Sequence, residues 1–106
     1  MINQYDVFWT DLDPTRGSEM AKTRPCVVVS PKEIHDYMCT AIVIPITSTL
    51  QRHPCRVKCH IKNRDGEIAT DQIKTVDKSR LGDFIGALSE SEIKALRDSL
   101  KRLLCQ

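Results

Sequence analysis

Short apolar runs separated by turn-forming residues fill the first three quarters of the chain. The run at 25–29 is continuously apolar, which is typical of a strand buried on both faces. In residues 55–61 apolar and polar side chains alternate strictly. This pattern predicts a strand whose solvent-exposed face carries Arg56, Lys58 and His60. The pattern as a whole predicts strands at 5–10, 25–29, 40–44, 55–61, 67–71 with a continuation at 73–76, and 83–87.

The segments between these strands carry their own signals. Asp65-Gly66 is a strong hairpin signal, and residues 13–18 contain the turn formers that end the first strand. Residues 32–37 predict a single helical turn between two strands. The predicted sheet therefore consists of short strands with mostly short connections.

The last seventeen or so residues follow a helical period instead. Ser89 and Glu92 have the spacing of a capping box, in which each side chain bonds the other residue's backbone N–H. One apolar stripe follows the cap, formed by Ile93, Leu96, Leu100, Leu103 and Leu104. We therefore predict a mainly β protein with a C-terminal α-helix, built as a small, strongly bent sheet or barrel. Such a small core favours dimerisation.

Composition limits what kind of protein this is. The chain has 106 residues, 41% of them hydrophobic and 28% charged, with a net charge of +2. These values predict one folded domain over 1–106 and argue against a disordered chain. A nucleic-acid site would have to be a local patch, because the overall charge is small. No apolar run reaches membrane-spanning length and the first residues lack a secretory pattern, so we expect a cytoplasmic protein without a membrane partner.

Five cysteines are an odd number for a disulfide framework. They predict reduced thiols that serve mostly in packing, with a zinc site as the less favoured alternative. The three histidines are scattered and fit no metal or cofactor motif, and no cofactor is expected.

The connection 13–24 is long for so small a domain, and long loops are often functional. It ends at Arg24, directly before the buried run. An arginine fixed at the edge of a strand is suited to hold a phosphate in a bidentate manner. The alternative is an ion pair with Glu19 or an aspartate, and the residues alone favour neither.

Three blocks, in this order, resemble the MazF/PemK-type toxins, the ribonuclease halves of bacterial toxin–antitoxin pairs. They are residues 9–31, residues 44–48 with the sequence Ile-Pro-Ile-Thr-Ser, and residues 71–77 followed by Arg80-Leu81. The resemblance covers nearly the whole chain. It implies a single SH3-like barrel of the CcdB/PemK type that forms a homodimer. It also implies a metal-independent endoribonuclease that cuts single-stranded RNA, inhibits translation and growth, and is blocked by a cognate antitoxin.

RNA can be cleaved by attack of its own 2′-hydroxyl on the adjacent phosphorus, which requires proton transfer and stabilisation of the phosphate charge. Arg24 matches the catalytic arginine of the family and would stabilise that charge. Thr47 matches a family position by motif, and its hydroxyl would donate to the phosphate. Ser48 is a further candidate for a second contact. A strand-end hydroxyl that only caps the loop is the alternative for Thr47.

Glu19 matches a family glutamate and is the first candidate for the base, with Asp71 as the second. A structural hydrogen bond is the alternative role for Asp71. Some relatives have a histidine where this chain has Ser18 and an arginine where it has Ala69. The version of the site that uses those two groups therefore does not transfer to this chain.

RNA recognition would involve residues outside this catalytic set. Arg52 and His53 lie in a loop after Thr47 and are suited to stack on splayed bases or bond to them. Arg56 and Lys58 would follow the phosphate backbone, although basic residues on a solvated strand face are common. Gln72, within the third block, is also assigned to RNA binding. Trp9 is a candidate for stacking, with the core or a dimer interface as the alternative.

Two other functions compete with RNA cleavage. The related CcdB toxins poison DNA gyrase, an activity associated with a tryptophan near the end of the terminal helix. Here the only tryptophan is Trp9, far from that helix in the sequence. A non-catalytic barrel that binds nucleic acid or sequesters an antitoxin is the second competitor.

Overall fold

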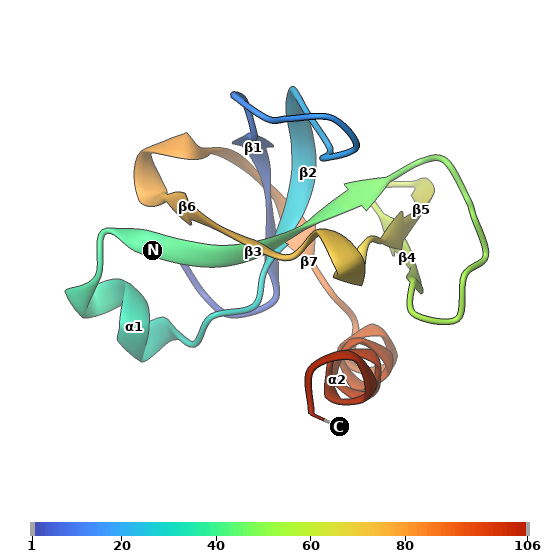
Figure 1. Ribbon diagram of the computed structural model, residues 1–106. Helices are drawn as coiled ribbons and strands as arrows, with labels where there is room; N and C mark the ends of the chain where they lie inside the picture. The colour runs from blue at the N-terminus through green and yellow to red at the C-terminus, as the bar shows by residue number, and fades with distance from the viewer. Residues whose placement is uncertain (1, 106) are drawn as a thin grey trace.

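One strongly bent antiparallel sheet forms the body of the protein in the computed structural model, which describes residues 2–105 (Figure 1). Its path runs β4-β5-β3-β2-β1-β7, and β6 pairs with the first half of β3. The strands are β1 (Asp6–Asp11), β2 (Thr23–Val28), β3 (Thr40–Thr47), β4 (Val57–Ile61), β5 (Arg64–Ile68), β6 (Lys74–Asp77) and β7 (Leu81–Ala87). The helices are α1 (Lys32–Tyr37) and α2 (Glu90–Leu104), with short 3₁₀ turns η1 (Thr70–Gln72) and η2 (Lys78–Arg80).

The predicted fold class, mainly β with a C-terminal α-helix, is confirmed. The second half of strand β2 shows why residues 26–28 are continuously apolar. Val27 packs into a core under α2, whereas Cys26 and Val28 pack into a second core on the other face of the sheet. Both faces of β2 are therefore buried over residues 26–28, which lie within the predicted strand 25–29.

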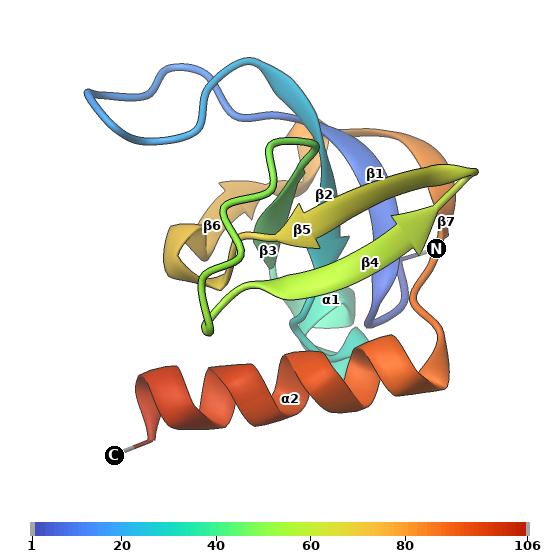
Figure 2. The same ribbon diagram turned by 90° about the vertical axis from the view of Figure 1, so that its right-hand side faces the viewer.

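Helix α2 begins with the predicted capping box. The Ser89 side chain accepts a hydrogen bond from the Glu92 backbone N–H, and Oε1 of Glu92 accepts one from the Ser89 backbone N–H. The other carboxylate oxygen of Glu92 accepts a bond from the His60 backbone N–H at 2.7 Å. Leu96 is fully buried in the core that α2 covers. The cap thus also attaches the helix to β4, along which it lies (Figure 2).

The hairpin between β4 and β5 turns at a different place from the predicted one. Lys62 and Asn63 both have positive φ, 51° and 64°, and form the two-residue turn. Asp65 and Gly66 lie inside β5, opposite His60 and Cys59. A Cβ on Gly66 would come within 3.0 Å of the Thr47 carbonyl oxygen. Glycine at this position therefore permits the close approach of β5 and β3, and the Asp65-Gly66 hairpin prediction was wrong.

All five cysteines are free thiols. Cys26 and Cys59 are buried, and burial raises the pKa of each thiol to about 12. At neutral pH both are uncharged and serve as small apolar side chains.

Neither helix found within residues 2–105 combines the length and the apolar character needed to cross a bilayer.

Candidate functional site

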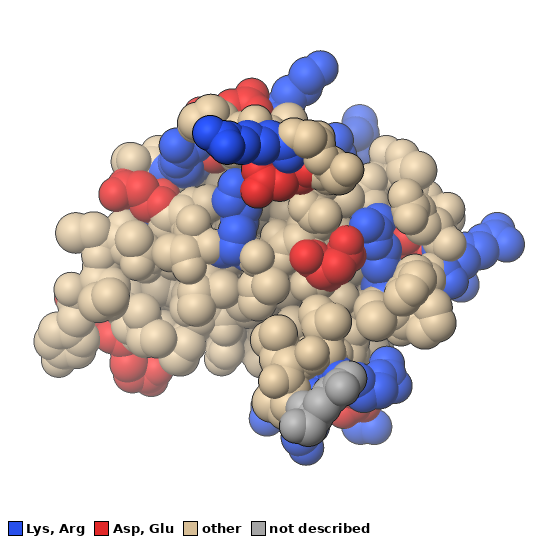
Figure 3. Space-filling view, in the orientation of Figure 1, with Lys and Arg blue, Asp and Glu red and all other residues tan. Residues whose placement is uncertain are grey.

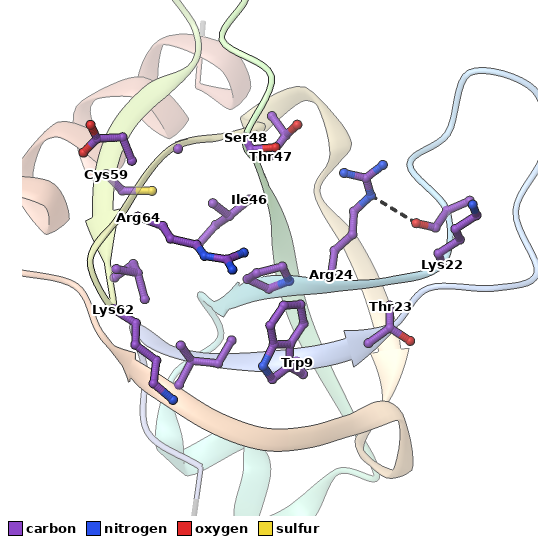
Figure 4. A pocket seen from close by; sticks show the side chains of 16 residues that line it. Trp9, Lys22, Thr23, Arg24, Ile46, Thr47, Ser48, Cys59, Lys62 and Arg64 are labelled. Atoms are coloured by element: carbon purple, nitrogen blue, oxygen red, sulfur yellow. Dashed lines mark hydrogen bonds between the residues drawn. The ribbon is translucent and has the colours of Figure 1, made fainter.

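A cavity of about 550 Å³ opens between the start of β2, the end of β3 and the β4–β5 hairpin. We call it the groove. Trp9 and Pro25 contribute apolar surface, while Arg24, Thr47 and Arg64 contribute polar groups. Figure 4 shows the Arg24 side chain directed toward the end of β3, where Thr47 and Ser48 lie. Side chains from distant parts of the sequence therefore converge here.

Arg24 is positioned by both its strand and the preceding loop. It pairs with Thr10 of β1, and its Nε donates to the Ala21 carbonyl at 3.0 Å. Within residues 2–105, Arg24 makes no ion pair with Glu19 or an aspartate, and its terminal nitrogens bond no protein group. The bond from Nε orients the guanidinium and leaves its two terminal nitrogens available to a phosphate.

Thr47 ends β3 at the wall of the groove. Its side chain is buried, and its Oγ1 accepts a hydrogen bond from the Thr49 backbone N–H at 3.1 Å. The hydroxyl proton is left to donate to a ligand, since the Thr49 bond uses only an oxygen lone pair. Ser48 follows in an exposed position at the same wall. Arg24, Thr47 and Ser48 are thus the predicted site residues that line the groove.

The two candidate bases lie elsewhere. Glu19, Asp71 and Gln72 line a second cavity of about 230 Å³ together with Lys74. The Glu19 carboxylate accepts a hydrogen bond from the Arg16 backbone N–H at 2.6 Å within its own loop. The Gln72 side-chain oxygen accepts one from the Met20 backbone N–H at 3.2 Å. Neither Glu19 nor Asp71 lines the groove that contains Arg24.

Arg56 and Asp71 are bound to each other. Nε of Arg56 donates to Oδ1 of Asp71 at 3.2 Å, and Nη2 donates to Oδ2 at 3.3 Å. Partial burial raises the pKa of Asp71, but the bonds from Arg56 and Gln72 outweigh it and hold the pKa below its usual value. Arg56 precedes β4 and does not lie on the solvent-exposed face of that strand. The prediction that its guanidinium lies along the strand was therefore wrong.

The loop between β3 and β4 exposes Arg52 and His53, whose contact with RNA stays a prediction. Lys58 is also exposed and lies opposite Glu67 of β5. The sequence interpretation missed Glu67, a buried carboxylate that accepts two bonds from this loop. No local pattern signals its burial, because Glu67 stands at the first position of the predicted strand 67–71 and shares a side with Asp71. Lys62 and Arg64, on the hairpin beside the groove, were missed as well.

Trp9 lines the groove and is 40% exposed, so its ring is not part of either core. On the face shown in Figure 3, basic and acidic side chains are interspersed. Basic side chains gather there over the β1–β2 loop and the β4–β5 side of the molecule.

Comparison with known proteins places these features in a family. A profile described as "PemK-like, MazF-like toxin of type II toxin-antitoxin system" matches residues 3–104. The endoribonuclease toxin MazF of Escherichia coli K12 is 29% identical over 110 residues, which span 98% of this chain and 99% of that protein.

Solved structures agree in fold. MazF from Deinococcus radiodurans superposes with a TM-score of 0.89 at 22% identity, covering 99% of this chain and 97% of that one. A mycobacterial endoribonuclease in complex with its cognate antitoxin superposes with a TM-score of 0.83 at 20% identity, covering 98% and 95%.

Proposed function

The chain belongs to the PemK-like, MazF-like toxins of type II toxin–antitoxin systems, and we propose that it cleaves single-stranded RNA in the groove by 2′-hydroxyl attack. Endoribonuclease activity and a toxin role follow from this membership. Cleavage at short sequences would lower translation and arrest growth. The observation that carries the proposed mechanism is the Arg24 guanidinium, whose terminal nitrogens bond no protein group among the described residues and are directed toward Thr47 and Ser48.

In the reaction, the 2′-oxygen bonds to the adjacent phosphorus while the bond to the 5′-oxygen breaks. The base takes the proton of the 2′-hydroxyl and the departing 5′-oxygen takes up a proton, so the products are a 2′,3′-cyclic phosphate and a 5′-hydroxyl, and no metal enters the step. Negative charge grows on the non-bridging phosphate oxygens during the attack. Two terminal nitrogens of Arg24 and the Thr47 hydroxyl are donors for those oxygens, with Ser48 as a further donor. Donors already held in position stabilise this charge without having to reorganise.

The proton-transfer role is a separate part of the proposal. Glu19 and Asp71 line the second cavity, and the Asp71 carboxylate is bound by Arg56. A carboxylate with a lowered pKa and a bound guanidinium is a weak proton acceptor. We therefore assign charge stabilisation to Arg24 and Thr47, and rank Glu19 above Asp71 as the base. Because Glu19 lines the second cavity and not the groove, this role requires its loop to bring the carboxylate within hydrogen-bond reach of the 2′-hydroxyl when RNA binds.

The RNA strand would continue from the groove onto neighbouring surfaces. Arg52 and His53 would contact bases, Lys58 a phosphate, and Gln72 the strand beyond the second cavity. Arg56 contributes to RNA binding only indirectly, because its guanidinium is hydrogen-bonded to the Asp71 carboxylate. Trp9 offers an exposed ring in the groove on which a base can stack.

The proposal includes partners as well. We place the protein in the cytoplasm as a single toxin domain that forms a homodimer and is held inactive by a cognate antitoxin. The antitoxin complex of a mycobacterial relative with the same fold supports this partner. A homodimer would cover apolar surface that one copy leaves exposed, including Phe84 at 58% exposure.

The deciding experiment incubates the purified protein with a long single-stranded RNA in EDTA and maps the ends. We expect discrete cuts with 2′,3′-cyclic phosphate and 5′-hydroxyl ends, lost in Arg24→Ala. Arg97→Ala is a matched control, since Arg97 is an exposed arginine of α2 away from the groove. Intact RNA with folded wild-type protein would refute the proposal and lead to assays of gyrase poisoning and of antitoxin binding without cleavage.

A further inference from the structure

Glu67 is the only carboxylate that is buried within residues 2–105, and it is 1% exposed. It lies in β5, opposite Thr47 of β3 on one side and Lys58 of β4 on the other. Buried carboxylates are rare unless their oxygens are bonded. The partners of Glu67 therefore indicate what the residue is for.

Both oxygens of Glu67 bind the backbone of the β3–β4 loop. Oε1 accepts a hydrogen bond from the Gln51 N–H at 3.0 Å, and Oε2 accepts one from the Arg52 N–H at 3.0 Å. Arg52 has a φ of 56°, in the left-handed region. Consecutive N–H groups around such a residue form a concave anion site, and the carboxylate of Glu67 occupies it.

The far end of the same loop is also held by buried polar groups. The Cys55 carbonyl accepts hydrogen bonds from the hydroxyls of Thr70 and Ser99. His53 lies between the two anchors, and its Nδ1 accepts a bond from the Cys55 N–H at 3.1 Å. The loop backbone is thus held at both ends, while the side chains of Arg52 and His53 remain exposed.

Charge favours the ionised form of Glu67. Burial raises the pKa of this carboxyl, but the two loop N–H groups and the nearby Arg56 and Lys58 lower it further than burial raises it. The pKa is therefore below its usual value, and the group is an anion at neutral pH. Its negative charge complements the two N–H dipoles of the loop.

We infer that Glu67 is a positioning residue for RNA recognition, because it fixes the loop backbone that carries Arg52 and His53. It does not touch the RNA itself. The inference rests on the proposed function, since it concerns how the same site selects its substrate. It predicts that loss of Glu67 weakens RNA binding through Arg52 without removing the donors of Arg24 and Thr47.

The test compares Glu67→Gln with wild type on a short single-stranded RNA that contains the mapped cut site. Glutamine keeps the size of the side chain but offers one oxygen where two are needed. We expect KM to rise about tenfold while kcat changes less than about threefold, because binding is lost and the reacting groups remain. Amide exchange at Gln51 and Arg52 should also become faster. Asp77→Asn is the matched control, since Asp77 accepts the Ser79 N–H at a site away from the groove.

A double-mutant cycle separates positioning from general weakening. Arg52→Ala should raise KM in the wild-type background but add less than about twofold in the Glu67→Gln background, because both changes remove the same contact. Independent, multiplying effects would overturn the inference. So would an unchanged KM in Glu67→Gln.

A second variant covers the case in which Glu67→Gln does not fold. Glu67→Asp keeps the buried charge beside Arg56 and Lys58 but shortens the reach toward Gln51 and Arg52. A raised KM with retained kcat supports the inference, and wild-type values overturn it. Wild-type protein that leaves the RNA intact would instead refute the proposed function, which keeps the two failures distinct.

Discussion

Arg56 and Asp71 form a two-point ion pair, with donor–acceptor distances of 3.2 and 3.3 Å. Arg56 was a candidate for contact with the RNA backbone and Asp71 a candidate for the catalytic base. In the structure their side chains bind each other instead. The pair connects the segment before β4 to η1, fifteen residues further along the chain. Its Arg56 side chain is 10% exposed and its Asp71 side chain 46% exposed, so solvent screens one end only.

A double-mutant cycle measures the strength of this pair. Arg56→Met, Asp71→Asn and the double variant should give a coupling free energy of about 1 kcal/mol, between the values for exposed and buried pairs. Urea unfolding of the four proteins provides the values. Additive effects would show that the contact does not stabilise the fold.

Replacement of Arg24 should reduce cleavage strongly and in a graded manner. Arg24→Ala removes both terminal donors, and a loss of about 10²–10³-fold in kcat is the expected scale for a donor to a developing oxyanion. Arg24→Lys keeps the charge but not the forked geometry, so it should remain well below wild type. Single-turnover cleavage of a short RNA measures both. Full activity in the lysine variant would show that charge alone suffices.

Acid should destabilise the folded protein through its carboxylates. The pKa values of Glu67 and Asp71 are lowered in the folded state, so both groups bind protons more weakly there than in the unfolded chain. The stability they contribute is complete above the usual carboxyl pKa of about 4 and is lost as pH falls below it. Urea unfolding between pH 7 and pH 3 should show this loss. A variant with Glu67→Gln and Asp71→Asn should show a shallower dependence.

Gly66 should not tolerate a side chain. The added Cβ would come within 3.0 Å of both Ile46 Cγ2 and the Thr47 carbonyl oxygen, and the backbone atom has little freedom to move. We expect Gly66→Ala to lower the free energy of unfolding by about 1–3 kcal/mol, the usual cost of overpacking. Gly86→Ala is the control, because its Cβ would meet Ile61 at an ordinary 3.7 Å. Equal stabilities would contradict the tight approach of β5 and β3.

The cysteines should differ in reactivity. Cys39 and Cys105 are exposed, whereas burial raises the pKa of Cys26 and Cys59 to about 12 and leaves almost no thiolate at pH 8. Iodoacetamide should therefore modify Cys39 and Cys105 first, with Cys26 and Cys59 protected until urea unfolds the protein. Peptide mass spectrometry follows each site. Cys59 lines the groove, so its early modification would show that this wall opens to solvent.

Local patterns were sufficient for most of the secondary structure. The helix at 90–104 could be predicted because a cap and an apolar stripe act within one or two turns of chain. The hairpin turn was misplaced because Asp-Gly is a strong local signal, and only the close approach of Gly66 to β3 shows why glycine stands there.

The sequence by itself determined the strand and helix pattern and the motifs that place Arg24 and Thr47 in a known family. Only the tertiary structure decided which polar residues lie together and which bind each other. It brings Arg24 and Thr47 into one groove and places Glu19 and Asp71 in another cavity. It also pairs Arg56 with Asp71 and lets Glu67 bind the backbone of the β3–β4 loop. Periodicity and capping depend on neighbours a few residues away, whereas a buried charge takes whichever partner the folded chain brings within hydrogen-bond reach.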